Sequence, residues 1–365
     1  MWRVCATESR SLMHKEEAPK KAPLRPALSA IFVIGTVCAF AAASLFCSEE
    51  NPVWNPLLAM HDRTFAALGS DTVGDVYVTK ERLLRRRVSY SGEQLEEAAG
   101  IISGFAQNSK APVWFLGVPT SAGIYADTLS ESAPYINERT LLRTFSEELD
   151  SKVNWLEAAS WLYGMKDQYV YYRTDSRWTS YGAFYIYQSV IRKLGFHAVG
   201  YDHYTITHFT DEYYGDLAQE IRYYDVQPDL VDLYTAENES KPISINAFRA
   251  DLTSVPLQSY YRTEEAAAAE NAYAVFGLEQ FAVLQMELSS KSAKSLLLLC
   301  DSFGSTMLPF LWQHYRNVTA VNLSLARETD WQALTEEREY SHVIILCSTE
   351  TLLDEHGLDA LHNRS

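Results

Sequence analysis

Residues 296–304 read LLLLCDSFG, and this stretch decides the fold. Five apolar residues lead directly into an acidic residue and a serine, after which an amphipathic segment begins. An uninterrupted apolar run of this length is typical of a strand that is buried on both faces of a sheet. A serine at the turn into the following helix is a common position for a nucleophile, and its backbone N–H can stabilise an oxyanion. Ser302 is therefore a candidate nucleophile with Asp301 beside it; alternatively, one of the two residues only caps the helix.

Two more short apolar strands are predicted downstream, at residues 318–323 and 343–346. Helix-like segments at 307–315 and 330–338 separate the three strands. Strands that alternate with helices imply right-handed crossovers and a parallel sheet that is covered on both faces. Sites in such sheets form beyond the carboxyl ends of the strands, which is where Ser302 is expected.

The middle of the chain contains further elements of both kinds. Helical spacing of apolar residues and short apolar runs predict helices at 93–107, 140–150, 155–165 and 180–194, and strands at 76–78, 113–118 and 170–172. A polar, tyrosine-rich stretch around residues 206–264 is expected to be an insertion. The whole pattern indicates an α/β fold with a mostly parallel sheet.

Residues 174–179 read TDSRWT and follow the predicted strand 170–172. A nucleophilic serine needs a base that removes its proton, and the base needs an acid that orients it. An Asp-x-His-Trp sequence would provide both, but Arg177 stands at the histidine position and cannot accept a proton at physiological pH. Asp175 is the candidate acid, with Trp178 beside the site; alternatively, Asp175 and Arg177 form a structural ion pair.

Composition limits the classes of ligand. The chain has 365 residues, 47% of them hydrophobic, which is enough for a sizeable core. Its formal net charge of -16 argues against a nucleic-acid partner, because phosphate binding needs clustered Lys and Arg. The 23 Tyr, 15 Phe and 8 Trp are compatible with rings that stack on sugars, or with ordinary core packing.

The five cysteines have neither CxxC nor Cys/His spacing, so no metal site is expected. No glycine-rich phosphate loop occurs either, and the sequence therefore predicts no cofactor. Cys300 and Cys347 each end an apolar run and could lie on adjacent strands. We expect them to be buried thiols rather than a disulfide.

Residues 27–46 read ALSAIFVIGTVCAFAAASLF and contain no charge. Such a run is long enough to cross a hydrocarbon core of about 30 Å as a helix. Lysines and an arginine precede it and two glutamates follow it, so the positive-inside rule places the N-terminus in the cytoplasm.

This topology gives a single-pass protein of the cell membrane with an extracellular C-terminal domain. The predicted parts are a basic cytoplasmic tail (1–26), a transmembrane signal anchor (27–47), a stalk (48–71) and an extracytoplasmic domain (72–365). Cleavage after the small residues 41–43 would instead release a secreted protein.

The stretch 174–179, followed by GAF at 182–184 and by Tyr187, resembles the signature of the DHHW protein family. That family is related to the SGNH-hydrolase-like alginate O-acetyltransferases, which have an Asp-x-His-Trp-Thr pattern. Further short blocks agree with the family in the same order, namely residues 74–77, 118–120, 124–127, 228–229, 232–234, 301–303, 309–311 and 314–315. The resemblance covers nearly the whole exported part.

The resemblance implies an SGNH-hydrolase-like three-layer α/β/α fold, with Ser302 as the nucleophile and Asp175 as the orienting acid. Proteins of this kind commonly act outside the membrane with a multispanning membrane O-acyltransferase that supplies acetyl groups. The serine takes the acetyl group and passes it to a hydroxyl of a polysaccharide.

Two positions depart from the family. Arg177 replaces the catalytic histidine, and Gly277 is the only remnant of a Gly-Gly-Asn element that serves the oxyanion, because Leu278 and Glu279 follow it. Losing a base and an oxyanion donor together lowers rates by several powers of ten. The candidate replacement bases are His203, His208, His314 and His342.

Three functions remain open on this basis. The first is transfer of acetyl groups to an exported polysaccharide through Ser302. The second is a catalytically inactive relative that binds a glycan or serves as an assembly subunit. The third is an extracellular carbohydrate esterase, which would release acetate to water without a partner.

Overall fold

The computed structural model describes residues 71–130, 133–236, 240–269, 271–336 and 338–362. The chain divides into two compact units, 1–61 and 62–365, and every described residue belongs to the second. The predicted cytoplasmic tail, transmembrane segment and stalk lie outside the described residues, apart from Asp71. Within the described ranges, no helix has the length and apolar character needed to cross a membrane.

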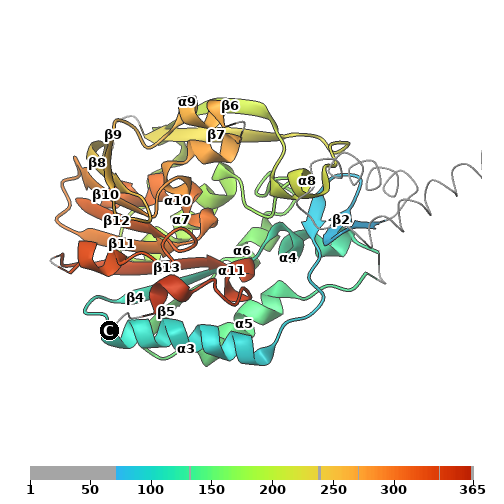
Figure 1. Cartoon of the computed structure of the whole chain (residues 1–365), viewed down its shortest axis with the longest axis horizontal. Coiled ribbons are helices and arrows are strands. Elements are labelled where there is room, and N and C mark those ends of the chain that lie inside the picture. The colour runs from blue at the N-terminus through green and yellow to red at the C-terminus, as the bar shows by residue number, and fades with distance from the viewer. Residues whose placement is uncertain (1–70, 131–132, 237–239, 270, 337, 363–365) are drawn as a thin grey trace, which may run out of the picture. The chain divides into compact units, whose positions relative to one another are not determined.

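An eight-stranded sheet forms the centre of the second unit (Figure 1). Its strand order is β5-β4-β13-β11-β12-β10-β8-β9, and the five strands from β5 to β12 are parallel, whereas the other three pair antiparallel. The strands are β4 (Val113–Val118), β5 (Val153–Leu156), β8 (Pro242–Phe248), β9 (Ser254–Leu257), β10 (Val283–Leu288), β11 (Ser295–Cys300), β12 (Asn317–Asn322) and β13 (His342–Ser348). The predicted α/β fold with a mostly parallel sheet is confirmed.

Side chains of the central strands alternate between two buried clusters. In β11, Leu296 and Leu298 belong to one cluster, and Leu297 and Leu299 to the other. Both faces of the sheet are therefore apolar and must be covered. Helices α3 (Gly92–Asn108) and α5 (Glu138–Glu148) contribute to the cluster of Leu297, and α7 (Ser180–Lys193) and α10 (Ser302–Leu311) to that of Leu296, which gives three layers (Figure 1).

Smaller elements complete the unit. They are the sheet of β1 (Thr72–Val73), β2 (Val76–Val78) and β3 (Leu83–Arg85), the pair β6 (Tyr204–Tyr213) and β7 (Asp229–Ala236), and the helices α4 (Ser121–Tyr125), α6 (Ala159–Gly164), α8 (Asp216–Ile221), α9 (Thr263–Ala268) and α11 (Thr349–Leu352). The segment around 206–264, expected as an insertion, is divided. Strands β6 and β7 form their own sheet, whereas β8 and β9 extend the central one.

Three predicted elements are wrong in extent. Residues 155–165 do not form one helix, because Trp155 lies in β5 and α6 begins only at Ala159. Residues 330–338 contain only the 3-10 turn Trp331–Leu334, and 170–172 contribute only an isolated bridge. In each case the apolar spacing fits more than one short structure, and packing decides between them.

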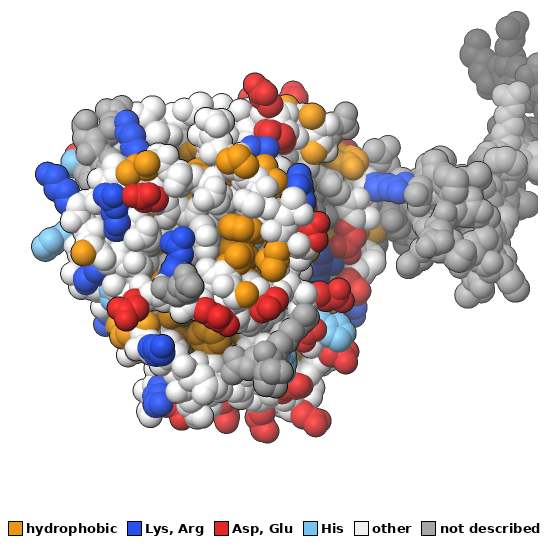
Figure 2. All heavy atoms as spheres, turned by 60° about the vertical axis from the view of Figure 1, so that its left-hand side comes forward, with side chains coloured by type: hydrophobic (Ala, Val, Ile, Leu, Met, Phe, Trp, Pro, Cys, Tyr) orange, Lys and Arg blue, Asp and Glu red, His pale blue; other side chains and the backbone are white. Residues whose placement is uncertain are grey.

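The two cysteines of the sheet are free and buried, as predicted. Cys300 belongs to the cluster of Leu296, and Cys347 to the cluster on the opposite face. Their side chains therefore point to different sides of neighbouring strands, and no disulfide joins them. On the outside, Figure 2 shows acidic and basic side chains interspersed over one face of the molecule, with apolar side chains gathered between them.

Candidate functional site

Ser302 lies where β11 ends and α10 begins, at the carboxyl edge of the parallel strands. The residue is half-buried. Its carbonyl oxygen accepts a hydrogen bond from the Tyr273 hydroxyl at 2.9 Å. Among the described residues, none hydrogen-bonds the Ser302 hydroxyl, so this group is available to a bound molecule.

Asp301 has a different position and is buried. Its Oδ1 accepts from the Phe303 backbone N–H at 3.0 Å and caps α10. Its Oδ2 accepts from the Ser348 N–H at 2.6 Å and from the Thr351 hydroxyl at 2.7 Å. Of the two alternatives for Asp301, the geometry favours the cap: this carboxylate joins the start of α10 to the end of β13.

Asp175 and Arg177 form a buried bidentate ion pair. Arg177 donates from Nε to Asp175 Oδ1 at 2.8 Å and from Nη2 to Oδ2 at 2.6 Å, and the Tyr213 hydroxyl donates to Oδ2 at 2.7 Å. Burial would raise the pKa of Asp175, but the charge of Arg177 and these hydrogen bonds outweigh it and hold that pKa at about 2. Arg177 therefore stays a fixed cation at the position of the family's histidine.

Asp229, at the start of β7, holds the loop that carries this ion pair. It is fully buried and accepts from the Thr174 N–H at 2.9 Å, from the Arg173 N–H at 2.7 Å and from the Tyr169 hydroxyl at 2.6 Å. A carboxylate that receives several donors fixes the backbone around it. The loop is thus anchored immediately before Asp175.

Gly215 packs directly against Asp175. A Cβ at Gly215 would lie 2.5 Å from Asp175 Oδ2 and still closer to the Asp175 Cβ. We therefore expect Gly215→Ala to lower the free energy of unfolding by about 1–3 kcal/mol, as overpacking usually does. Urea unfolding measures this, and Gly164→Ala, with no atom within 4 Å of its added Cβ, is the matched control. Equal stability of the two variants would contradict the tight contact.

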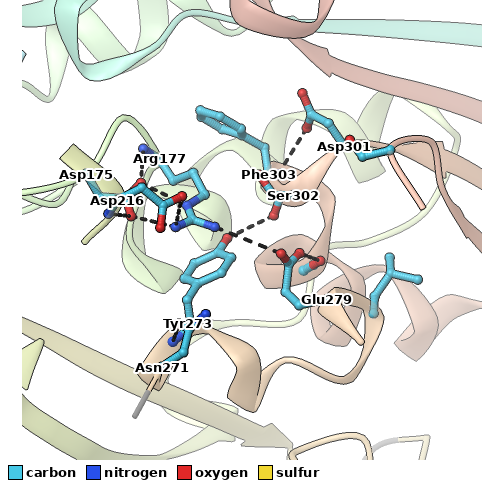
Figure 3. Close-up of polar contacts among 12 residues, drawn as sticks. Asp175, Arg177, Asp216, Asn271, Tyr273, Glu279, Asp301, Ser302 and Phe303 are labelled. Carbon is cyan, nitrogen blue, oxygen red and sulfur yellow. Dashed lines mark hydrogen bonds and ion pairs between the residues drawn. The ribbon is translucent and has the colours of Figure 1, made fainter. Parts of the chain in front are cut away.

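Arg177 makes further contacts with Tyr273, Asp216 and Glu279 (Figure 3). Its guanidinium carbon lies 3.7 Å from the centre of the Tyr273 ring, and Nη2 also donates to Asp216 at 2.9 Å. Nη1 lies 3.9 Å from Glu279 Oε2, and this is its sole polar contact within the described part of the chain.

Glu279 ends the 3-10 turn Gly277–Glu279, and its side chain is 16% exposed. Its Oε1 accepts a hydrogen bond from the Ser305 hydroxyl. Burial raises the pKa of Glu279 to about 7, although Arg177 and Ser305 act in the opposite direction. Residues three apart on a helix have Cβ atoms about 5–6 Å apart, so the carboxyl group that binds Ser305 lies close to Ser302.

These contacts link the residues into a ring. Arg177 stacks on Tyr273, and Tyr273 donates to the backbone carbonyl of Ser302; on the other side, Arg177 faces Glu279, which binds Ser305 on the same helix as Ser302 (Figure 3). The ring therefore contains a serine, a carboxyl that titrates near neutral pH and a permanent cation. Nucleophilic catalysis needs these three kinds of group.

The family model described as DHHW protein matches residues 62–321. The chain belongs to the DHHW protein family. No curated protein matches it in sequence.

Solved structures share the fold of this DHHW protein. Bacillus cereus PatB1 with a sulfonyl adduct has a TM-score of 0.67 at 18% identity, covering 77% of this chain and 97% of that chain. A DHHW family protein from Eubacterium siraeum has a TM-score of 0.63 at 18% identity, covering 79% and 97%. The O-acetyltransferase domain of Pseudomonas putida AlgJ also matches, with a TM-score of 0.47 at 14% identity, covering 80% and 99%.

Two further site candidates of this DHHW protein have structural contacts. Trp178 is fully buried and donates from its indole N–H to the Phe303 carbonyl at 3.0 Å and to the Thr306 hydroxyl at 2.8 Å. The Gly277 N–H donates to the Tyr260 carbonyl at 3.0 Å, and a Cβ at Gly277 would lie 2.6 Å from that oxygen. Trp178 thus positions α10, and the Gly277 N–H already has an acceptor.

The four histidines that are candidate bases in the DHHW protein lie on other elements than the ring around Ser302. His314 follows α10, is buried against the Tyr187 hydroxyl at 2.7 Å, and burial lowers its pKa to about 4. His342 begins β13, at the opposite edge of the sheet from Ser302. His208 lies on β6, and His203 in the turn before it. In the described part of the chain, His208, His314 and His342 hydrogen-bond Asp232, Tyr187 and Tyr315, none of which belongs to the ring around Ser302.

Sequence reasoning missed most of the partners of Arg177 in this DHHW protein. Glu279 could have been recognised from the sequence, because it stands where the family resemblance implies the asparagine of an oxyanion element. Tyr213, Asp216 and Tyr273 belong to no motif, and only the fold brings them together. In the described ranges, no group of three or more His, Cys, Asp or Glu side chains could hold a metal ion.

Proposed function

We propose that this DHHW protein belongs to a system that O-acetylates a cell-surface or exported polysaccharide, and that Ser302 carries the acetyl group. The observation that supports catalysis is that Glu279, whose pKa is about 7, binds the Ser305 hydroxyl one helical turn from Ser302 on α10. A base with a pKa near the operating pH is the most effective proton acceptor. The resemblance to the O-acetyltransferases supports the class of substrate.

In the first half-reaction, the Ser302 oxygen attacks the carbonyl carbon of the acetyl donor. The hydroxyl proton passes to the Glu279 carboxylate, directly or through one water molecule. The bond between the acetyl group and the donor then breaks, and the protonated Glu279 returns the proton to the departing donor. An acetyl ester on Ser302 remains.

In the second half-reaction, a sugar hydroxyl attacks the acetyl ester. Glu279 accepts the hydroxyl proton, the bond to the Ser302 oxygen breaks, and that oxygen takes the proton back. Negative charge develops on the carbonyl oxygen in both half-reactions. Arg177 Nη1, with its single contact at 3.9 Å, is the donor that would stabilise this charge.

The acetyl donor is proposed to be a multispanning membrane O-acyltransferase. The support is the uncharged run 27–46, which would anchor the protein in the same membrane and keep the domain outside the cytoplasm. Anchoring two proteins in one membrane raises their effective concentration, so a short stalk is enough for transfer.

A second function is favoured by one observation, namely that Arg177 is locked onto Asp175 where the family has a base. In this case the protein is a catalytically inactive subunit that binds a glycan or assists assembly. The two functions differ in whether Ser302 is activated.

The test is to treat the purified full-length chain with a sulfonyl fluoride and to locate the adduct by mass spectrometry. The related PatB1 was solved with a sulfonyl adduct. We expect one adduct, on Ser302, which is lost in Ser302→Ala and retained in the matched control Ser146→Ala, whose serine lies on the surface.

Two results would contradict acetyl transfer through Ser302. An undiminished adduct in Ser302→Ala would mean that another residue is the nucleophile. No adduct in the wild type or in Arg177→His, with binding of a polysaccharide retained, would favour the inactive subunit.

A further inference from the structure

A second cleft lies apart from the ring around Ser302. Its volume is about 760 Å³, which is in the range of binding sites for small molecules. It is lined by the turn between β2 and β3, by α4 and the turn after it, and by residues 166–173. It shares no lining residue with the ring of Arg177, Tyr273, Glu279 and Ser302.

Arg82 is the most unusual group in this cleft. Its guanidinium carbon lies 3.4 Å from the centre of the Tyr125 ring. Its Nη1 atom is buried without a hydrogen-bond partner, and no carboxylate in the part of the chain that the structure describes forms an ion pair with it. Burial lowers the pKa of Arg82. Arg82 is half-buried, and a polar atom that is buried without a partner is unfavourable, so a bound anion that hydrogen-bonds this guanidinium would offset the cost.

Three more cations line the same cleft. Arg173 lies with its guanidinium 4.7 Å from the Tyr169 ring, Lys166 pairs with Asp127, and Lys80 is exposed at the rim. Arg173 Nη1 is 3.7 Å from a carboxylate oxygen of Asp229, a looser contact than a hydrogen bond. The cleft is thus lined by four cations and by three acids, Glu81, Asp127 and Asp167, on a chain with an overall charge of -16.

The other lining groups indicate what kind of anion fits. Asp127, Asp167, Gln168 and Gln227 offer carboxylate and amide oxygens, which accept hydrogen bonds from hydroxyl groups. The same carboxylates would repel a ligand that carries several negative charges. A molecule with one carboxylate per sugar unit and many hydroxyls can bind both the cations of the cleft and its carboxylate and amide oxygens.

We propose that this cleft binds an acidic saccharide, with a sugar carboxylate at Arg82 and sugar hydroxyls at the carboxylates and amides. The inference does not depend on acetyl transfer by Ser302, because the two sites share no residue. Arg173 is nevertheless two residues before Asp175, and Asp229 contacts both the cleft and the loop of the first site.

The test is a calorimetric titration of the full-length chain at low ionic strength with the tetramer of β-1,4-linked glucuronic acid. Cellotetraose, which differs by the absence of the carboxylates, is the matched neutral probe. We expect binding of the acidic tetramer to exceed that of cellotetraose by about tenfold or more, since hydrogen bonds to charged groups are the strong ones. Arg82→Gln should remove most of this difference.

A second variant keeps the test valid if Arg82→Gln fails to fold. Lys80→Glu changes an exposed residue and should weaken the acidic tetramer about twofold to fivefold, as expected for a rim charge. Arg143→Ala, at a surface position 66% exposed on α5, should leave binding unchanged. Labelling of Ser302 by the sulfonyl fluoride should persist in Arg82→Gln, which separates a failure of the cleft from a failure of the first site.

Three results would overturn the proposal. Equal binding of cellotetraose and the acidic tetramer would exclude recognition of the carboxylate. Wild-type affinity in both Arg82→Gln and Lys80→Glu would exclude the cleft. Inorganic phosphate that binds as tightly as the tetramer would exclude the saccharide as the ligand.

Discussion

Asp175→Ala is expected to lower the free energy of unfolding by about 3–5 kcal/mol, because it leaves a buried guanidinium without its carboxylate. Asp175 is 1% exposed and Arg177 7% exposed. The substitution also removes the acceptor of the Tyr213 hydroxyl and of the Asp216 N–H. Urea unfolding at pH 7, followed by circular dichroism, measures the loss.

The matched control is Asp216→Ala. Asp216 contacts the same guanidinium nitrogen, but its side chain is 64% exposed. Exposed ion pairs contribute at most about 1 kcal/mol, so this variant should be nearly as stable as the wild type. Equal losses of stability in Asp175→Ala and Asp216→Ala would mean that the buried ion pair contributes no more to the free energy of unfolding than the exposed one.

The same ion pair gives a dependence on pH. The pKa of Asp175 is about 2 in the folded protein and about 3.9 in an unfolded chain, so the unfolded state binds more protons between these values. The contribution of Asp175 is thus complete above pH 4 and is lost as the pH falls toward 2. Asp175→Ala should lack this part of the acid denaturation.

Glu279→Gln is expected to lower kcat for acetyl transfer by about 10²–10⁴-fold, the range for a general base. In the wild type, kcat/KM should rise about tenfold per pH unit up to pH 7 and then level off, because the carboxylate is the active form and its pKa is about 7. The variant should lose this rise. A series of rates between pH 5 and pH 9, with an activated acetyl ester and a sugar acceptor, measures both effects.

Glu279 should also reduce stability as the pH rises from about 4.5 to about 7. Its pKa is raised above that of an unfolded glutamate, so the folded state binds more protons between about pH 4.5 and pH 7. Stability contributed by the protonated group is complete below pH 4.5 and falls as the pH rises to 7, by up to about 3 kcal/mol. The free energy of unfolding of Glu279→Gln, measured relative to that of the wild type, should therefore be higher at pH 8 than at pH 5.

The control for both effects is Glu287→Gln, on β10, whose side chain is 45% exposed. Neither its pH–rate profile nor its relative stability should differ from the wild type. A Glu279→Gln variant that keeps activity within about threefold of the wild type would contradict the role of Glu279 as the base, because a general base contributes at least about 10²-fold.

Four of the five parallel strands could be predicted from the sequence, whereas β5 and the antiparallel strands of the sheet could not. Strands β4, β11 and β13 contain continuous apolar runs, because both of their faces are covered. Strand β12 (NVTAVN) has fewer apolar residues but is buried along nearly its whole length. Strand β8 (Pro242–Phe248) is mostly exposed or half-buried and has no such run. The sequence pattern therefore places it in an insertion, although it pairs with β10.

The site divides in the same way. Ser302 and Asp175 could be found because each follows a recognisable strand or motif. Glu279 comes from a 3-10 turn without periodicity, and about a hundred residues separate it from Arg177. Its raised pKa arises from burial, which a sequence does not report. The histidines had the right chemistry but lie elsewhere in the fold.

Strand β13 is the last strand in the chain and yet pairs with both β4 and β11. More than two hundred residues separate Val113 from its partner Val343. A chain that emerges N-terminus first from a ribosome or a translocation channel therefore cannot join the two halves of the parallel sheet until residues 342–348 have appeared. Until then Asp301 also lacks Ser348, its anchor on β13. A truncated chain would accordingly expose two unpaired apolar strand edges, and we expect such chains to depend on chaperones or to be degraded.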